Sequence, residues 1–156
     1  MKKVLSVAPA ASAVDAALLI ARVGIALLML THGLPKMAML FSGDPVQFPS
    51  VLGFSPELSL GLTVFAEVFC SLLLLAGLGT RLAVVPLIVT MLVAAFVIHA
   101  ADPFAKQEPA LYFLLVYLVL LLAGSGKYSV DYLLQPKGAK TAYAAVNERK
   151  TALSSY

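Results

Sequence analysis

Charged side chains are scarce in this sequence. Of its 156 residues, 11 are Lys or Arg and 8 are Asp or Glu, so only 12% are charged, whereas 61% are hydrophobic. Ordinary globular proteins have about 25% charged residues. A soluble domain of this size must cover a large surface with polar groups, and this composition cannot do so. The sequence therefore indicates a membrane protein in contact with the lipid bilayer, and its net charge of +3 needs no nucleic-acid partner.

Cysteine is almost absent. Cys70 is the single thiol, so intramolecular disulfides, thiol–disulfide relays and cysteine-rich metal sites are excluded, because each needs at least two. A cleaved signal peptide is also disfavoured, since the apolar stretch before the small residues 11–13 is too short for one. We expect Lys2 and Lys3 to anchor the first span in the cytoplasm.

Four segments are apolar and about long enough to cross a bilayer, which takes roughly 20 residues. We predict helices over about residues 15–41, 58–79, 82–101 and 109–124, the last extended by a polar first turn at 104–108. Turns with Gly, Pro, Ser or Asp separate them. The predicted fold is an all-α four-transmembrane-helix bundle.

The basic residues are distributed unevenly between the two sides of this bundle. Lys36 and Lys106 fall on one side and eight others on the opposite side, which places both termini in the cytoplasm (N-in/C-in). We predict a cytoplasmic segment 1–13, a membrane domain 14–134 and a polar, disordered cytoplasmic tail 135–156. The eight basic residues are Lys2, Lys3, Arg81, Lys127, Lys137, Lys140, Arg149 and Lys150.

The predicted connection between the first two helices, residues 42–57, is an extended outer loop and is long for a helical hairpin. It lies on the outer surface or folds back as a lid, because irregular backbone is tolerated at membrane depth only where it is buried in protein or wetted.

Ionisable residues within the predicted helices are the candidates for function, because each costs at least ~2.5–3.5 kcal/mol at membrane depth. Arg22, His32 and Lys36 lie within an arc of about 80° on the first helix. A rise of 1.5 Å per residue puts His32 and Glu67 about 13 Å below the outer ends of their helices. Glu67 continues a polar seam at steps of four, formed by Ser59, Thr63 and Ser71.

These positions predict a polar pocket open to the outside. We assign proton handling to Glu67 and His32, and ligand binding to the remaining polar side chains. Those are Arg22 near the inner boundary, and Lys36, His99, Glu108 and Tyr112 in the outer half.

Each candidate also has a structural interpretation. Arg22 and Lys36 can snorkel to the two interfaces. Glu67 can form a structural ion pair or hydrogen bond. Glu108 and the histidines can be interface or packed core residues.

Imidazole next to carboxylate can pass protons, which suits quinone chemistry. A mixed nitrogen/oxygen metal site is disfavoured, because no H-x-x-x-H or H-x-x-E pair is present, and a bis-histidine haem is a minor alternative. Gly77-x-Gly79 and Gly124-x-Gly126 end helices rather than follow strands, so they are not dinucleotide loops. No motif for flavin, haem or metal is found, and a quinone fits as a substrate.

Six short motifs occur in order along the chain. They are Ala21-Arg22-Val23-Gly24, His32-Gly33-Leu34-Pro35-Lys36, Ala66-Glu67, Gly77-Leu78-Gly79-Thr80-Arg81-Leu82-Ala83, His99 with Asp102-Pro103-Phe104, and Gly124-Ser125-Gly126-Lys127-Tyr128-Ser129-Val130-Asp131. In order and spacing they resemble the DoxX family, small four-helix membrane proteins that include membrane subunits of thiosulfate:quinone oxidoreductase-type systems. The resemblance covers about residues 21–134.

The resemblance implies a bacterial inner-membrane protein that is an oxidoreductase or a subunit of one. Arg22, His32, Lys36, Glu67 and His99 match the family's polar positions, although the family is functionally broad. The leading hypothesis is a membrane subunit of a quinone-linked oxidoreductase, working on a quinone or a small reduced substrate with a soluble oxidoreductase subunit. The alternative is a non-catalytic small-molecule binding, transport or assembly protein, and a homo-oligomer is left open for either.

Overall fold

The computed structural model describes residues 11–138, 140–141 and 145–146, and all regular structure in these ranges is helical. Within them, four helical stretches are long and apolar enough to cross a membrane: Ser12–Phe41, Pro56–Ala76, Thr80–Ile98 and Phe104–Ala123. The chain is therefore an all-α membrane protein, as its scarcity of charge predicts. The fourth span begins at Phe104, so the predicted polar first turn is part of the helix.

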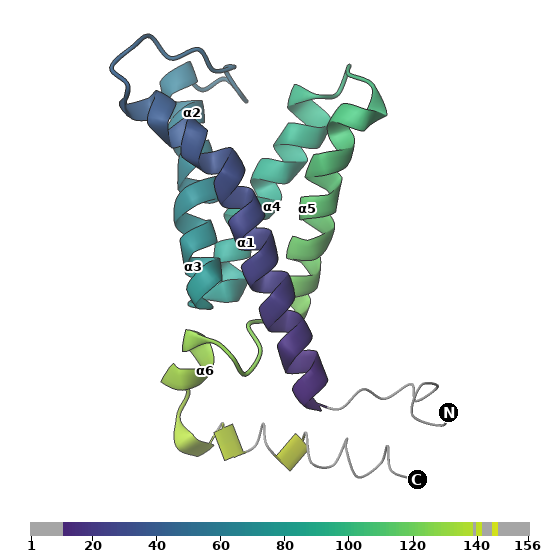
Figure 1. Cartoon of the computed structure of the whole chain (residues 1–156). Helices are drawn as coiled ribbons and strands as arrows, with labels where there is room; N and C mark the ends of the chain where they lie inside the picture. The colour runs from purple at the N-terminus through teal and green to yellow at the C-terminus, as the bar shows by residue number, and fades with distance from the viewer. Residues whose placement is uncertain (1–10, 139, 142–144, 147–156) are drawn as a thin grey trace.

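Helix α1 forms the first span and α5 the fourth. The second and third spans each contain a π-helical turn, and a short helix follows the fourth span. In order, the elements are α1 (Ala11–Phe41), α2 (Pro56–Val64), the π-helical turn η1 (Phe65–Cys70), α3 (Ser71–Ala76), α4 (Thr80–Val93), the π-helical turn η2 (Ala94–Ile98), α5 (Phe104–Ala123) and α6 (Val130–Leu134). Helix α1 runs diagonally across the others (Figure 1) and packs along α2, η1 and α3, while α4 packs chiefly on α5.

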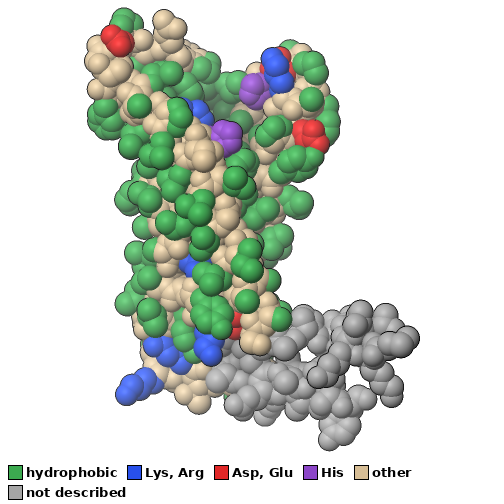
Figure 2. Space-filling model, viewed as in Figure 1, with side chains coloured by type: hydrophobic (Ala, Val, Ile, Leu, Met, Phe, Trp, Pro, Cys, Tyr) green, Lys and Arg blue, Asp and Glu red, His purple; other side chains and the backbone are tan. Residues whose placement is uncertain are grey.

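The bundle has two distinct ends. The loop end carries residues 42–55 and 99–103, and the termini end carries residues 77–79, α6 and the start of α1 (Figure 1). Most of the described Lys and Arg side chains lie at the termini end (Figure 2). The predicted tail 135–156 and the predicted segment 1–13 lie largely outside the described residues.

Glycines and capping side chains end the helices where the sequence predicts turns. Gly77 follows α3 with φ +71°, and the Leu78 amide donates to the Leu73 carbonyl at 2.9 Å, as in a Schellman cap. At the start of α2, the Ser55 hydroxyl accepts from the Leu58 amide, and Pro56 occupies the first turn.

Packing is uneven along the bundle. The main core joins α1, α3, α4 and α5, and includes the fully buried Leu74, Val84 and Tyr117. A smaller core at the loop end contains Leu60, Val64 and Val68 of the second span. Val46 and Phe48 pack against this second core, so the segment 42–55 folds back on the helices. Two adjoining cavities, which contain the candidate site, lie at this loop end.

Candidate functional site

A cavity of about 390 Å³ lies at the loop end between α1, the second span and α4, and we call it the loop-end cavity. Its volume falls in the range of roughly 300–1,000 Å³ typical of small-molecule sites. Figure 2 shows the hollow at this end, with histidine side chains beside it. The segment 42–55 covers the cavity with apolar side chains: Phe48, Pro49, Val51, Leu52 and Phe54.

This cover is fixed by a few hydrogen bonds. The Val51 amide donates to the Ser59 hydroxyl at 3.1 Å, which ties the segment to α2. Leu52 has φ +53° and Gly53 φ +83°, and the Phe54 amide closes the turn on the Val51 carbonyl at 3.0 Å. A non-glycine residue at positive φ is strained, so the two hydrogen bonds of Val51 hold a conformation that Leu52 alone does not favour.

A buried ion pair forms part of the cavity wall. The Lys36 ammonium nitrogen lies 2.6 Å from each carboxylate oxygen of Glu67. Glu67 is 3% exposed and Lys36 29%. A carboxylate this deeply buried needs a partner to remain charged, so Lys36 makes a charged Glu67 possible. The pair joins α1 to η1 and lines the cavity at the same time.

His99 forms a second polar part of the wall. Its Nδ1 lies 2.8 Å from Asp102 Oδ2, and the Lys106 ammonium lies 3.2 Å from Asp102 Oδ1. The hydrogen bond from His99, and to a smaller extent the one from Lys106, holds the pKa of Asp102 below its usual value. An ionised carboxylate only accepts hydrogen bonds, so Nδ1 carries the hydrogen and Nε2 is left for a ligand. The Gln107 amide also donates to the His99 carbonyl at 2.9 Å.

A smaller cavity of about 180 Å³ adjoins the first, between α1, α4 and α5. The two cavities share Lys36, Glu67 and His99 in their walls. The smaller one adds His32, whose ring meets Phe113 edge-on with centroids 5.6 Å apart. The structure thus brings four of the predicted site residues around two adjoining cavities.

Both π-helical turns lie at this site. Glu67 is inside η1, and His99 directly follows η2, with its amide donating to the Ala94 carbonyl at 3.0 Å. A π turn inserts one residue into a helix and changes the direction of the side chains after it, and such turns are frequent at functional sites. Their position indicates that Glu67 and His99 are directed by local departures from α-helical geometry.

Gly33 allows α1 to approach η1 beside Glu67. A Cβ at position 33 would lie 2.8 Å from Val68 Cγ2 and 2.9 Å from Glu67 Cβ. Real Cβ atoms do not approach other atoms so closely, so only glycine fits. The close backbone approach sets the distance that Lys36, three residues further along α1, must span.

Two predicted ligand-binding residues are not brought to these cavities. The Tyr112 hydroxyl donates to Glu108, one helical turn away, and neither residue lines the two cavities. Tyr112 is 59% exposed. This pair is a local contact on α5.

Arg22 lies at the termini end, away from the cavities. Its guanidinium donates to the carbonyls of Leu74 at 3.2 Å and Leu75 at 3.5 Å, and also to the Tyr128 carbonyl. Arg22 is 1% exposed, and Gly77 lies against it. A cation at the last carbonyls of a helix is favourable, so here Arg22 joins α1, the end of α3 and the segment before α6. It does not snorkel to solvent.

Two buried hydroxyls lie in the interior near Glu67. Ser71 and Tyr117 are both 0% exposed, and neither hydroxyl has a hydrogen-bond partner among the described residues. Tyr117 is close enough to Glu67 for the two to interact electrostatically. Buried hydroxyls normally have a partner, so these two are candidates for binding water beside the ion pair.

Reasoning from sequence did not assign roles to Asp102, Gln107 or Gly33. Asp102 follows His99 by three residues, and this spacing was the available signal for the pair. No sequence signal marks the π turns. Among the described residues, no group of three or more His, Cys, Asp or Glu is arranged to hold a metal ion.

Comparison with known proteins gives one finding. The protein-family model described as DoxX matches residues 17–100, more than half of the chain. This range contains Arg22, His32, Lys36, Glu67 and His99, whereas Glu108 and Tyr112 lie outside it. No curated protein and no solved structure matches the chain. With its four membrane-spanning helices, this integral membrane protein belongs to the DoxX family.

Proposed function

We propose that the protein is the membrane subunit of a quinone-linked oxidoreductase system and that the loop-end cavity binds the quinone. The observation that carries the proposal is the composition of this cavity: apolar walls, with Lys36, Glu67 and His99 as its charged or titratable members. A quinone has a flat apolar ring and carbonyl oxygens that accept hydrogen bonds. It therefore needs apolar walls with a few polar groups at fixed positions.

The polar groups suit the proton chemistry of a quinone. Conversion of a quinone to a quinol takes up two electrons and two protons. In the proposed reaction a soluble oxidoreductase subunit supplies the electrons. The His99 ring, oriented by Asp102 through Nδ1, passes a proton to one oxygen through Nε2. The Lys36–Glu67 pair gives a proton to the other oxygen, and His32 in the adjoining cavity replaces it.

We further propose the inner membrane of a bacterium as the location, with both termini in the cytoplasm and the loop-end cavity facing outward. The concentration of Lys and Arg at the termini end supports this orientation (Figure 2). Cys70 is 2% exposed, so a newly introduced cysteine can be labelled without interference. A membrane-impermeant maleimide applied to intact cells should label Ser42→Cys and not Lys137→Cys. The opposite labelling pattern would reverse the orientation.

The binding step is tested with decylubiquinone and the detergent-purified full chain. We expect Glu67→Gln and His99→Gln each to weaken binding by about tenfold or more, which corresponds to about 1.4 kcal/mol or more. Glu57→Gln is the matched control, because Glu57 is an exposed acid outside the cavity. Unchanged binding by both cavity variants would exclude this site.

Catalysis is tested separately from binding. Membranes of the host should reduce the added quinone faster when the chain is present than when it is deleted, and Glu67→Gln should remove the difference. Quinone binding with no change in reduction would instead assign the chain to the non-catalytic class of binding, transport or assembly proteins.

A further inference from the structure

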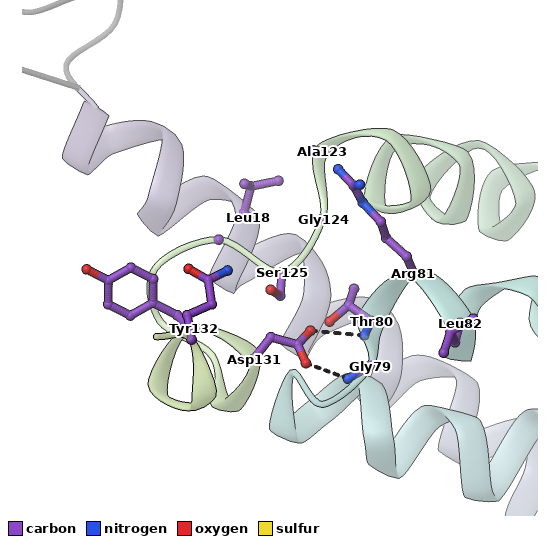
Figure 3. A pocket seen from close by; sticks show the side chains of 12 residues that line it. Leu18, Gly79, Thr80, Arg81, Leu82, Ala123, Gly124, Ser125, Asp131 and Tyr132 are labelled. Atoms are coloured by element: carbon purple, nitrogen blue, oxygen red, sulfur yellow. Dashed lines mark hydrogen bonds between the residues drawn. The ribbon is translucent and has the colours of Figure 1, made fainter. Parts of the chain in front are cut away.

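A second large cavity, about 440 Å³, lies at the termini end and takes no part in the proposed quinone site. Its walls come from the ends of α1, α4 and α5 and from the segment leading into α6 (Figure 3). Polar side chains line much of it: Thr80, Arg81, Ser125, Asp131, Tyr132 and Gln135.

Arg81 supplies the positive charge of this cavity. Figure 3 shows its side chain extending from α4 toward Ala123 and Gly124. One Nη2 hydrogen bond, 3.1 Å long, reaches the Leu122 carbonyl at the end of α5. A guanidinium has five N–H donors, so this bond leaves donors for an oxyanion. Gly124, with φ +80°, lies beside the guanidinium, and a Cβ there would be 3.5 Å from Arg81 Nε, an ordinary contact distance.

The carboxylate of Asp131 is engaged by the start of α4, because both its oxygens accept hydrogen bonds there. Oδ1 accepts from the Gly79 amide at 2.7 Å, and Oδ2 from the Thr80 amide at 3.2 Å. Figure 3 shows Asp131 turned toward these two residues and away from Arg81. Thr80 is 1% exposed, and its hydroxyl has no partner in the described part of the chain. The cavity thus has an available cation and an unused hydroxyl.

The lipid-facing surface continues from this cavity. Leu82 lines the cavity and is 78% exposed. Leu122 adjoins it, next to Ala123 of the cavity wall, and is 79% exposed. The two leucines lie at the ends of two membrane-spanning helices. A ligand with a phosphate at Arg81 and acyl chains along these leucines would use both surfaces. Basic pockets between transmembrane helices are known to bind lipid headgroups in this way.

We propose that this cavity binds the phosphate of a membrane phospholipid headgroup, with Arg81 as the principal ligand and with the acyl chains against Leu82 and Leu122. The same phosphate chemistry would fit a free phosphate ester, but the exposed leucines favour a lipid. This site is independent of the quinone proposal, and either one can fail without the other.

The test measures thermal unfolding of the delipidated full chain in detergent, with three added compounds. These are phosphatidylglycerol, diacylglycerol with the same acyl chains, and glycerol 3-phosphate. A lipid at about 100 times its Kd should raise Tm by roughly 5–10 °C. We expect this shift from phosphatidylglycerol alone. Equal stabilisation by diacylglycerol would show that the phosphate is not recognised, and equal stabilisation by glycerol 3-phosphate would show a free-phosphate site; either overturns the proposal.

Matched variants locate the effect. Arg81→Gln should lose the shift, whereas Lys137→Gln, which removes an exposed charge at the same end outside the cavity, should keep it. An unchanged shift in Arg81→Gln overturns the assignment. If Arg81→Gln fails to fold, Leu122→Ala tests the lipid site instead, because the Leu122 side chain is exposed and contributes little to the core. It should weaken the shift more than Leu72→Ala, a 50% exposed leucine on α3, and equal effects overturn the proposal.

Discussion

Lys36 and Glu67 are joined by two contacts of 2.6 Å at the place where the loop-end cavity and the smaller cavity adjoin. Lys36 comes from α1 and Glu67 from η1, so the pair ties the first span to the second. The same contacts place two ionisable groups in the wall of both cavities. Stability and proposed function therefore depend on the same two residues.

The first prediction concerns removal of one partner. Lys36→Met should lower the free energy of unfolding by roughly 3 kcal/mol, at the low end of the range for a broken buried pair, because Lys36 retains 29% exposure. The double variant Lys36→Met/Glu67→Gln should recover part of this loss, since no unpaired charge remains. Chemical unfolding in detergent measures both. A double variant no more stable than the single one would contradict the ion-pair explanation.

The second prediction compares two glycines on α1. Gly33→Ala should destabilise the protein by about 1–3 kcal/mol through overpacking, because its Cβ would lie 2.8 Å from Val68 Cγ2. Quinone binding should fall with it, since α1 must move away from Glu67.

Gly24→Ala is the matched control for this change. Nothing lies within 4 Å of a Cβ at position 24, and alanine is a better helix former than glycine by roughly 0.5–1 kcal/mol. Gly24→Ala should therefore be neutral or stabilising. Similar losses in both variants would mean that general helix effects, rather than the contact with η1, account for the result.

Much of the site could be predicted from sequence, for a physical reason. Hydropathy sets the four spans, and the constant rise of a helix then sets the depth of each side chain. The structure places His32, Lys36, Glu67 and His99 in the walls of two adjoining cavities at the loop end, and the roles assigned to them stay predictions. In the seam predicted at steps of four, Ser59, Glu67 and Ser71 are under 5% exposed, whereas Thr63 is only partly buried.

Other features depend on information that hydropathy and helical periodicity do not contain. The π turns change the direction of side chains through local backbone hydrogen bonds. The position of Glu108 and Tyr112 depends on the rotation of α5, which periodicity of an almost uniformly apolar helix does not define. The position of Arg22 near the inner boundary could be predicted from its place on the first helix, but its hydrogen bonds to the carbonyls of Leu74 and Tyr128 could not, because they depend on how the helix ends meet.

The third prediction concerns the junction at that end. A Cβ at Gly77 would lie 1.8 Å from Arg22 Nη1, and its φ is +71°. Gly77→Ala should therefore displace Arg22 from the carbonyls of α3 and destabilise the protein strongly. Gly79→Ala separates the two causes, because Gly79 has φ +58° with nothing within 4 Å. Gly79→Ala should lower the free energy of unfolding by only the cost of a left-handed backbone at a non-glycine residue, roughly 1–2 kcal/mol. Equal losses of Tm would show that the contact with Arg22 adds nothing.

The fourth prediction distinguishes structure from chemistry at Tyr117. Its buried hydroxyl has no partner among the described residues, so Tyr117→Phe should leave Tm unchanged or raise it. Decylubiquinone binding should be retained, because Tyr117 does not line the loop-end cavity. A fall in Tm would instead reveal an interaction of the hydroxyl that stabilises the fold.

The last prediction follows from the contact between His99 and Asp102. The hydrogen bond from His99 lowers the pKa of Asp102, and the one from Lys106 adds a smaller effect. The folded state therefore favours the ionised carboxylate. The stabilisation should be complete above the ordinary value of 3.8 and should be lost as the pH falls through the lower pKa of the folded protein. Wild type should thus be more stable than Asp102→Asn at pH 7, and the difference should shrink toward pH 3.

Asp44→Asn is the control for this pH series, because Asp44 is an exposed acid in the segment 42–55. Its difference from wild type should not follow the pattern of Asp102→Asn. The same titration should also affect the site, since protonated Asp102 no longer orients His99 as an ionised carboxylate does. Nitrogen NMR of the His99 ring should show Nδ1 carrying the hydrogen at pH 7 in wild type and a mixture of tautomers in Asp102→Asn. Identical ring spectra in the two proteins would contradict the orienting role of Asp102 and with it the assignment of Nε2 to the ligand.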